Sequence, residues 1–233
     1  MRVTLVLSAL LLAWSVVADL MIGERWYTAR NLALTALLLL AWWLMNDRRI
    51  GRTADEVGLA PQHLRSGFAW GGLAFVAVSA VIGVGVLLAD TVGPIGALLA
   101  DERTAMFADD LWFVALVRIP LGTAVFEEVA FRGVLLAAAQ RVLSTWRAVT
   151  LSSVVFGLWH IPPAMVALWI NDVAATAPEG VAAIAGIVVG TTIAGVGFSA
   201  LRLVSRSLVA PILAHVATNS VSLLAAVHVQ GLG

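Results

Sequence analysis

Cysteine and lysine are absent from the sequence, and charged residues occupy only 12% of its 233 positions. The absence of cysteine excludes a disulfide framework, a thiolate metal site and a cysteine nucleophile. The basic residues are therefore all arginine, and they balance the acidic residues to a formal net charge of zero. The sequence has no basic block that would predict nucleic acid as a partner.

Hydrophobic residues make up 61% of the chain, and its mean hydropathy is +0.98. A soluble domain of this length would carry about 25% charged residues. The composition therefore indicates an integral membrane protein, with the lipid bilayer as its surroundings. Because helices satisfy their own backbone hydrogen bonds in lipid, we predict an all-α fold, a polytopic membrane helix bundle.

About seven transmembrane helices are expected, since a helix needs about 20 apolar residues to cross the hydrocarbon. The apolar stretches are approximately 3–22, 30–46, 68–90, 110–140, 148–170, 180–201 and 207–229. Pro120 should bend or divide the fourth stretch, and Pro162-Pro163 should kink or break the fifth. The first stretch also resembles a signal peptide, although its apolar run is long for one. We favour a membrane span there.

Arginine placement predicts the orientation of the chain in the membrane. The loops 47–66, 141–147 and 202–206 all carry arginines, and they fall on one side if all the stretches span. The opposite side receives mostly acidic residues, although Arg25 and Arg30 also fall there. We therefore expect a protein of the plasma (inner) membrane with a cytoplasmic N-terminus.

Three groups of polar residues lie inside apolar stretches, where an ionisable side chain costs at least about 2.5 kcal/mol and is usually functional or paired. The groups are Glu127-Glu128-x-x-x-Arg132, Phe156-x-x-x-His160 and His215-x-x-x-Asn219. Residues four apart on a helix share a face, so Glu128 and Arg132 can pair. Glu127 is turned from Glu128 by about 100° and stays available for chemistry.

The three groups are expected to meet in space. Glu127, His160 and His215 lie at similar depths, roughly 20, 18 and 14 Å from the cytoplasmic ends of their segments at 1.5 Å per residue. We expect them to converge with Asn219 around one cavity that opens toward the cytoplasmic half. Glu127 and His160 should lie about 5–6 Å apart or less, so that they share one water.

The chemistry of these side chains allows two interpretations. A carboxylate beside an imidazole can activate water, as Glu127 and His160 would, while a second imidazole and an amide, His215 and Asn219, can stabilise an oxyanion. Alternatively, Glu127, His160 and His215 form a set of two histidines and one carboxylate that suits zinc. No H-E-x-x-H motif is present to decide between them.

Each group also has a structural interpretation when it is taken alone. The Glu128–Arg132 pair can hold helices together, and either histidine can be an ordinary buried residue with a satisfied ring. Phe156 can serve packing, and Asn219 can bond a neighbouring helix. The combination of the three groups in one chain favours the functional interpretation.

The chain resembles the CPBP family in the order and the membrane setting of three motifs. The motifs are E-E-x-x-x-R, F-x-x-x-H and H-x-x-x-N, and an arginine-glycine pair follows V-A-F. This family comprises the CAAX-processing endopeptidases and the bacteriocin-processing or bacteriocin-immunity proteins, and is also called ABI. The similarity covers roughly residues 110–224. It implies a protease core at residues 109–229, preceded by transmembrane segments in residues 1–108, within a single membrane domain.

The resemblance implies an intramembrane endopeptidase, a hydrolase that cleaves a membrane-associated peptide or protein. Matched by motif, Glu127 would activate water with His160, and His215 with Asn219 would form the oxyanion site. Glu128, Arg132 and Phe156 would be supporting residues.

The resemblance leaves the cofactor and the substrate open. The family is often called a metalloprotease, but a glutamate mechanism without metal is also advanced for it, so the expected cofactor is none or zinc. Its eukaryotic substrates are prenylated CAAX proteins, whereas many prokaryotic members lack an evident prenylated substrate. Two other functions remain: a non-catalytic bacteriocin-immunity or scaffold protein of the same fold, and a small transporter. A transporter often has two similar halves, and the sequence shows none.

Overall fold

The computed structural model describes residues 1–22, 26–46, 50–100, 102–107 and 109–232, and these ranges contain helices and turns but no β-strand. The prediction of an all-α bundle is confirmed. The first half contains α1 (Arg2–Val17), the π-helical turn η1 (Ala18–Ile22), α2 (Tyr27–Met45), α3 (Ile50–Val57), the 3₁₀ turn η2 (Pro61–His63), α4 (Leu64–Leu88), α5 (Gly93–Leu99) and the 3₁₀ segment η3 (Glu102–Phe107).

The second half begins with a continuous helical run over residues 111–140, in which α-helical and π-helical turns alternate. The run consists of α6 (Leu111–Phe113), η4 (Val114–Ala124), α7 (Val125–Glu127), η5 (Glu128–Leu135) and α8 (Leu136–Gln140). It is followed by α9 (Thr145–Trp159), α10 (Ile161–Ile170), α11 (Pro178–Ser205), α12 (Val209–Val216), the π-helical turn η6 (Ala217–Val221) and α13 (Ser222–Val229).

Six helical segments in the described part of the chain are long and apolar enough to cross a membrane. They are Arg2–Ile22, Tyr27–Met45, Thr53–Leu88, Thr145–Ile170, Pro178–Ser205 and Val209–Val229. The seventh predicted span, the 111–140 run, is helical but is not among the six. It differs from them in carrying Arg118, Glu127, Glu128 and Arg132 along its length.

The 111–140 run is the central helix of the bundle. Every residue from Phe126 to Ala139 is buried, and the run contacts α1, α2, α9, α11 and α12. The part from Phe126 to Ala139 is therefore buried on all sides and does not face lipid, whereas Trp112 and Leu116 near the start of the run are exposed. Its charged side chains are therefore surrounded by protein, where other side chains can neutralise them.

The hydrophobic core packs around this central helix. One cluster joins Phe126, Phe131 and Leu135 to Leu11 of α1 and to Phe156 and Trp159 of α9. Two hydroxyl groups on α1 add hydrogen bonds: Ser15 Oγ donates to the Trp159 carbonyl at 2.7 Å, and Thr4 Oγ1 donates to the Ala138 carbonyl at 3.4 Å. The same contacts hold α1 beside the site described below.

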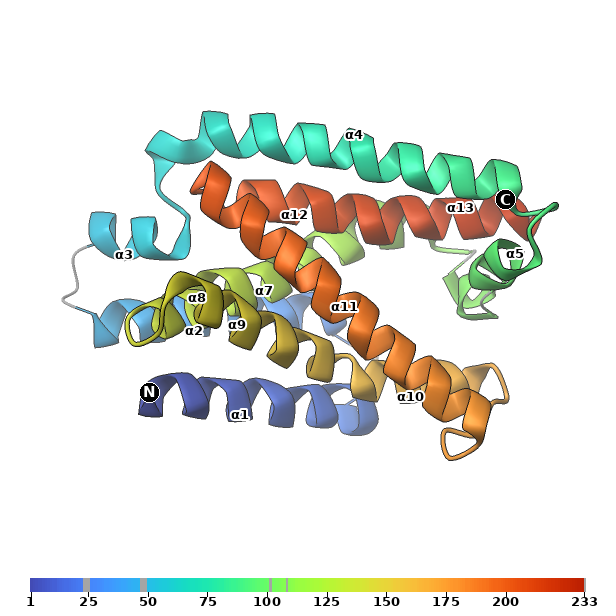
Figure 1. The fold of residues 1–233 in the computed structure, drawn as a ribbon, viewed down its shortest axis with the longest axis horizontal. Helices are drawn as coiled ribbons and strands as arrows, with labels where there is room; N and C mark the ends of the chain where they lie inside the picture. Colours follow the sequence, from blue (N-terminus) through green and yellow to red (C-terminus); the bar gives the residue numbers. More distant parts are fainter. Residues whose placement is uncertain (23–25, 47–49, 101, 108, 233) are drawn as a thin grey trace.

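The loops rich in arginine lie together at one end of the molecule, as predicted for one side of the membrane (Figure 1). Arg141 donates to Glu56 at 2.6 Å, and Arg206 donates to Asp55 at 3.3 Å. The opposite end holds α5, the turn between α10 and α11, and the C-terminus (Figure 1). Which end faces the cytoplasm remains a prediction from the arginines.

The Pro162-Pro163 pair divides a helix where the sequence indicated, whereas Pro120 does not interrupt the 111–140 run. α9 ends at Trp159, His160 adopts φ −84° and ψ −1°, and α10 begins at Ile161 with a proline in its first turn. Proline lacks the backbone N–H that would continue the earlier helix and is accepted in the first turn of a new one. Pro120 lies inside the π-helical segment η4. The break after α9 places the His160 ring at the junction of two helices.

Candidate active site

The side chain of Glu128 is fully buried and forms the polar centre of the site. Its Oε1 accepts a hydrogen bond from Arg132 Nη1 at 3.0 Å, and His215 Nδ1 lies 2.8 Å from the same oxygen. A carboxylate only accepts hydrogen bonds, so Nδ1 of His215 carries the proton and donates it. These two bonds hold Glu128 in place and direct the other nitrogen of His215 away from it.

Arg132 is almost completely buried, and aromatic rings cover its guanidinium. The centre of that group lies 3.9 Å from the Phe156 ring centroid and 5.1 Å from that of Phe198. Phe198, on α11, also stacks on the His215 ring, with centroids 5.2 Å apart and planes 17° apart. Cation–π contact with desolvated rings, together with the Glu128 carboxylate, stabilises a charge that would be costly in an apolar layer.

The backbone fixes the His160 ring. Its Nδ1 lies 2.7 Å from the carbonyl oxygen of Phe156, four residues earlier. A carbonyl only accepts, so Nδ1–H is the donor, and Nε2 of the neutral ring is left as an acceptor. The ring also meets the Phe156 ring edge-on, with centroids 4.6 Å apart. The motif F-x-x-x-H therefore orients the histidine through both the backbone and the side chain of Phe156.

Glu127 faces both histidines. Its Oε2 lies 4.0 Å from His160 Nε2 and 3.8 Å from His215 Nε2. Oε2 is buried and makes no hydrogen bond to any described residue. These distances are too long for direct hydrogen bonds but suit a single bridging water. Glu128 Oε2 is likewise buried without a hydrogen-bond partner among the described residues, but Glu128 does not line the cavity, so Glu127 is the glutamate available for chemistry.

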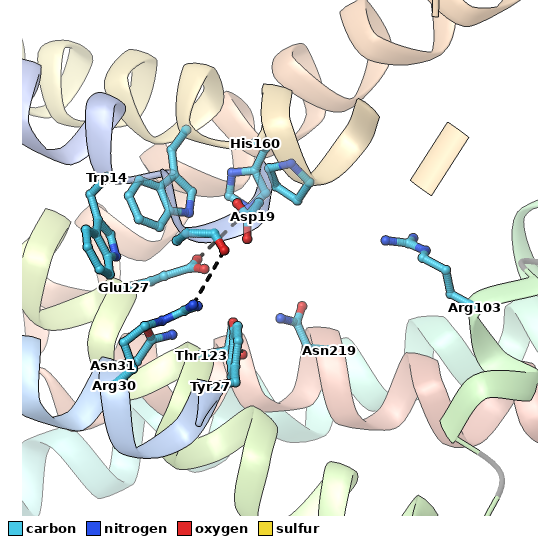
Figure 2. A pocket seen from close by; sticks show the side chains of 13 residues that line it. Trp14, Asp19, Tyr27, Arg30, Asn31, Arg103, Thr123, Glu127, His160 and Asn219 are labelled. Carbon is cyan, nitrogen blue, oxygen red and sulfur yellow. Dashed lines mark hydrogen bonds and ion pairs between the residues drawn. The ribbon is translucent and has the colours of Figure 1, made fainter. Parts of the chain in front are cut away.

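A cavity of about 250 Å³ lies beside Glu127. Its walls are polar over much of their area, and Figure 2 shows the side chains that surround it. Six lining residues come from the second half of the chain: Thr123, Glu127, Trp159, His160, Pro163 and Asn219. Seven come from the first half: Trp14, Ala18, Asp19, Tyr27, Arg30, Asn31 and Arg103.

The structure brings the predicted residues together, with one difference in detail. Glu127, His160 and Asn219 line the cavity, whereas His215 is 3% exposed and lies behind Glu127. His215 and Asn219 are four residues apart and would share one face of a regular α-helix, but the π-helical turn Ala217–Val221 begins between them. A wider turn changes the angle between residues four apart, so the two side chains no longer act as a matched pair.

The cavity extends from Glu127 toward the end of the molecule opposite the arginine-rich loops. Its wall includes Asp19 in η1 and Tyr27 at the start of α2, and it continues to Arg103 in η3, which follows α5 at that opposite end. The sequence predicted both that the arginine-rich loops are cytoplasmic and that the cavity opens toward the cytoplasm. In this structure those two predictions exclude each other.

The choice between zinc and no cofactor stays a prediction. Across the residues that the structure describes, no group of three or more histidine, cysteine, aspartate or glutamate side chains is arranged to hold a metal ion. Glu127, His160 and His215 approach one another but do not form such a group.

Sequence reasoning missed the wall that the first half of the chain contributes. Asp19 and Arg30 interrupt apolar stretches, which could have indicated that they belong to a functional site. Both lie near the ends of their stretches, however, where a charged side chain is ordinarily solvated. Tyr27 carried no signal, although its hydroxyl lies 3.0 Å from Thr123 Oγ1 at the cavity. Phe198 lies in a glycine-rich apolar stretch and resembled ordinary packing.

Comparison with known proteins gives one match. Residues 109–221 match the family model described as type II CAAX prenyl endopeptidase Rce1-like. This range contains the three polar motifs and ends two residues after Asn219. Searches of curated proteins and of solved structures returned no match to the chain.

Proposed function

Because residues 109–221 match the Rce1-like family of type II CAAX prenyl endopeptidases, we propose that this chain is an intramembrane endopeptidase. Glu127 and His160 activate the water that attacks the peptide bond. The substrate is a membrane-associated peptide or protein that reaches the cavity from the bilayer. The observation that carries the proposal is the buried Oε2 of Glu127, which has no hydrogen-bond partner among the described residues and faces two histidine nitrogens.

The geometry of Glu127 and His160 suits a nucleophilic water. Both Glu127 Oε2 and the unprotonated Nε2 of His160 are acceptors, and they are 4.0 Å apart. A water that donates to both at about 2.8 Å would have an angle of about 90° between its two hydrogen bonds, near its natural bond angle. Its lone pairs then point away from both acceptors, toward a substrate carbonyl. Glu127 accepts the proton as the oxygen attacks.

Asn219 is the best-placed donor for the developing oxyanion. It lines the cavity together with Glu127 and His160, and its amide NH₂ can donate to an oxygen there. His215 is suited to a different role than the sequence suggested. Its Nδ1–H is engaged by Glu128, and its Nε2 approaches Glu127 from behind. We assign His215 to anchoring this part of the central helix through Glu128, because its unprotonated Nε2 cannot donate to Glu127 or to an oxyanion.

The orientation in the membrane is part of the proposal. The positive-inside rule favours cytoplasmic arginine-rich loops and a cytoplasmic N-terminus in the plasma (inner) membrane. The cavity then extends from the middle of the bilayer toward the outer side. A substrate would enter laterally from the bilayer or from that side.

The proposed activity is tested with the purified protein in phosphatidylcholine nanodiscs. The probes are a farnesylated CAAX peptide and the same peptide without the lipid, and products are identified by mass spectrometry. We expect cleavage of at least one probe and no loss of activity with 1,10-phenanthroline. His228→Ala is a suitable control, because His228 is exposed and lies away from the cavity. Loss of activity with the chelator, reversed by zinc, would replace the metal-free mechanism with a metal-dependent one.

A further inference from the structure

The guanidinium of Arg132 has one edge that its ion pair and the aromatic rings leave without a partner. Nη1 donates to Glu128, and the rings of Phe156 and Phe198 cover the group. Nε and Nη2 are buried and make no hydrogen bond to any described residue. A guanidinium carries five N–H donors, and a buried donor that stays unpaired costs free energy. The edge formed by Nε and Nη2 therefore calls for a hydrogen-bond acceptor.

Two buried serine hydroxyls also have no partner. Ser153 on α9 and Ser199 on α11 are both 0% exposed, and neither Oγ makes a hydrogen bond to a described residue. A hydroxyl inside a helix commonly donates to the carbonyl one turn earlier, as Thr191 Oγ1 does to the Ile187 carbonyl at 2.7 Å. Because Ser153 and Ser199 form no such bond, each keeps its full capacity to donate and to accept.

These groups meet where α9 packs on α11. A Cβ added to Gly195 of α11 would lie 3.1 Å from Ser153 Cβ and 3.2 Å from Arg132 Nη2. Ser199 follows Gly195 by four residues and lies on the same face of α11. The unpartnered edge of Arg132 and the two hydroxyls thus surround one buried region between α9, α11 and the central helix. We call this region the α9–α11 polar site.

We propose that the α9–α11 polar site, formed by Arg132, Ser153 and Ser199, binds internal water. Water can accept from the arginine N–H groups and donate to the serine oxygens, and a buried water typically makes about three such bonds. The ligand is neutral because Glu128, 3.0 Å from Arg132, already balances the guanidinium charge. A second anion would leave unpaired negative charge in an apolar layer.

The α9–α11 polar site supports the candidate active site from outside the cavity. Arg132, Ser153 and Ser199 do not line the cavity. Arg132 Nη1 and His215 Nδ1 both bond Glu128 Oε1, so a ligand that fixes the guanidinium also fixes Glu128. The inference does not depend on peptide cleavage, and it is tested without a substrate.

The test is a double-mutant cycle on unfolding. The unfolding equilibrium constant is measured in mixed micelles of phosphatidylcholine and detergent for the wild type, Ser153→Ala, Ser199→Ala and the double variant. Removal of either hydroxyl should release the shared water. The double variant should therefore be about fivefold less destabilised than the product of the single effects predicts.

Ser152→Ala combined with Ser199→Ala provides the matched control cycle. Ser152 is also buried on α9, but its Oγ donates directly to the Phe131 carbonyl at 2.8 Å. Its effect should multiply with that of Ser199→Ala, because the two hydroxyls share no ligand. Simple multiplication in the cycle of Ser153 with Ser199 as well would overturn the proposal.

The neutrality of the ligand is tested by comparing sodium chloride with sodium gluconate at equal ionic strength. A bound anion would stabilise the folded protein in proportion to its concentration, whereas water is present in both salts. We expect equal unfolding constants for the wild type in the two salts. Stabilisation by chloride that the Ser153→Ala/Ser199→Ala variant lacks would overturn the assignment of water and identify an anion site.

Discussion

At the scale of single residues, Glu127 and Glu128 are adjacent in the sequence but have different surroundings. Glu128 Oε1 accepts from Arg132 and His215, whereas Glu127 lines the cavity and its Oε2 faces His160 and His215 without a hydrogen bond to a described residue. The helical rotation of about 100° between neighbours was enough to predict this division. The position of His215 behind Glu127 was not predictable, because it depends on the partner that its Nδ1 finds in the folded bundle.

Glu128→Ala should destabilise the protein by about 3–5 kcal/mol, because Arg132 would stay buried without its carboxylate. Thermal unfolding in detergent measures the change. The double variant Glu128→Met/Arg132→Met is the control, since it removes both charges and should recover much of the lost stability. A single variant as stable as the wild type would show that Glu128 does not neutralise Arg132.

His160→Ala and Asn219→Ala should differ in the activity they retain. Asn219→Ala removes one oxyanion donor and should lower kcat by about 10²–10³. His160→Ala removes a group that holds the water, and no neighbouring side chain replaces it, so no activity should be measurable. Initial rates of peptide cleavage at saturating substrate compare the two. Equal residual activity in both variants would contradict the separate roles.

At the scale of helices, α4 and α12 approach closely where glycines leave room. A Cβ added to Gly71 would lie 2.9 Å from Ala210 Cα and 2.8 Å from Leu213 Cδ1, whereas one added to Gly72 would meet nothing within 4 Å. Small residues allow such close packing of membrane helices. The helices and the break at Pro162-Pro163 were predictable from the apolar stretches and the prolines. The π-helical turns and these contacts were not, because they depend on the neighbouring helices.

Gly71→Ala should therefore destabilise the protein by about 1–3 kcal/mol, as overpacking commonly does. Gly72→Ala is a matched control at the next position of the same helix and should be neutral or slightly stabilising, because alanine favours the helical state. The measurement is the unfolding temperature of each variant and of the wild type in the same detergent. The assigned packing of α4 on α12 would be wrong if both variants unfolded at the same temperature.

At the scale of the whole molecule, the apolar bundle, the order of the motifs and their meeting point were predictable from the sequence. The polar wall from the first half was not, because nothing in the local sequence of Asp19, Arg30 or Arg103 indicates which distant helix they face. The structure also shows that the cavity extends away from the arginine-rich end. Orientation in the membrane therefore determines from which side a substrate arrives.

Cysteine labelling tests the orientation directly, because the natural chain has no cysteine. Ser144→Cys lies at the arginine-rich end, and Glu179→Cys lies at the opposite end; both positions are exposed. In intact cells, a membrane-impermeant maleimide should label residue 179 and not residue 144. The reverse pattern would place the arginine-rich loops outside and the cavity toward the cytoplasm.

The central claim is that Glu127 is the base for peptide hydrolysis and that Glu128 is not. The most direct measurement compares Glu127→Gln with the wild type in nanodiscs, using the cleavage rate and the unfolding temperature together. We predict that Glu127→Gln lowers the rate by at least about 10²–10⁴, the contribution of a general base, while the protein stays folded. A folded Glu127→Gln protein that cleaves the peptide at the wild-type rate would contradict the account.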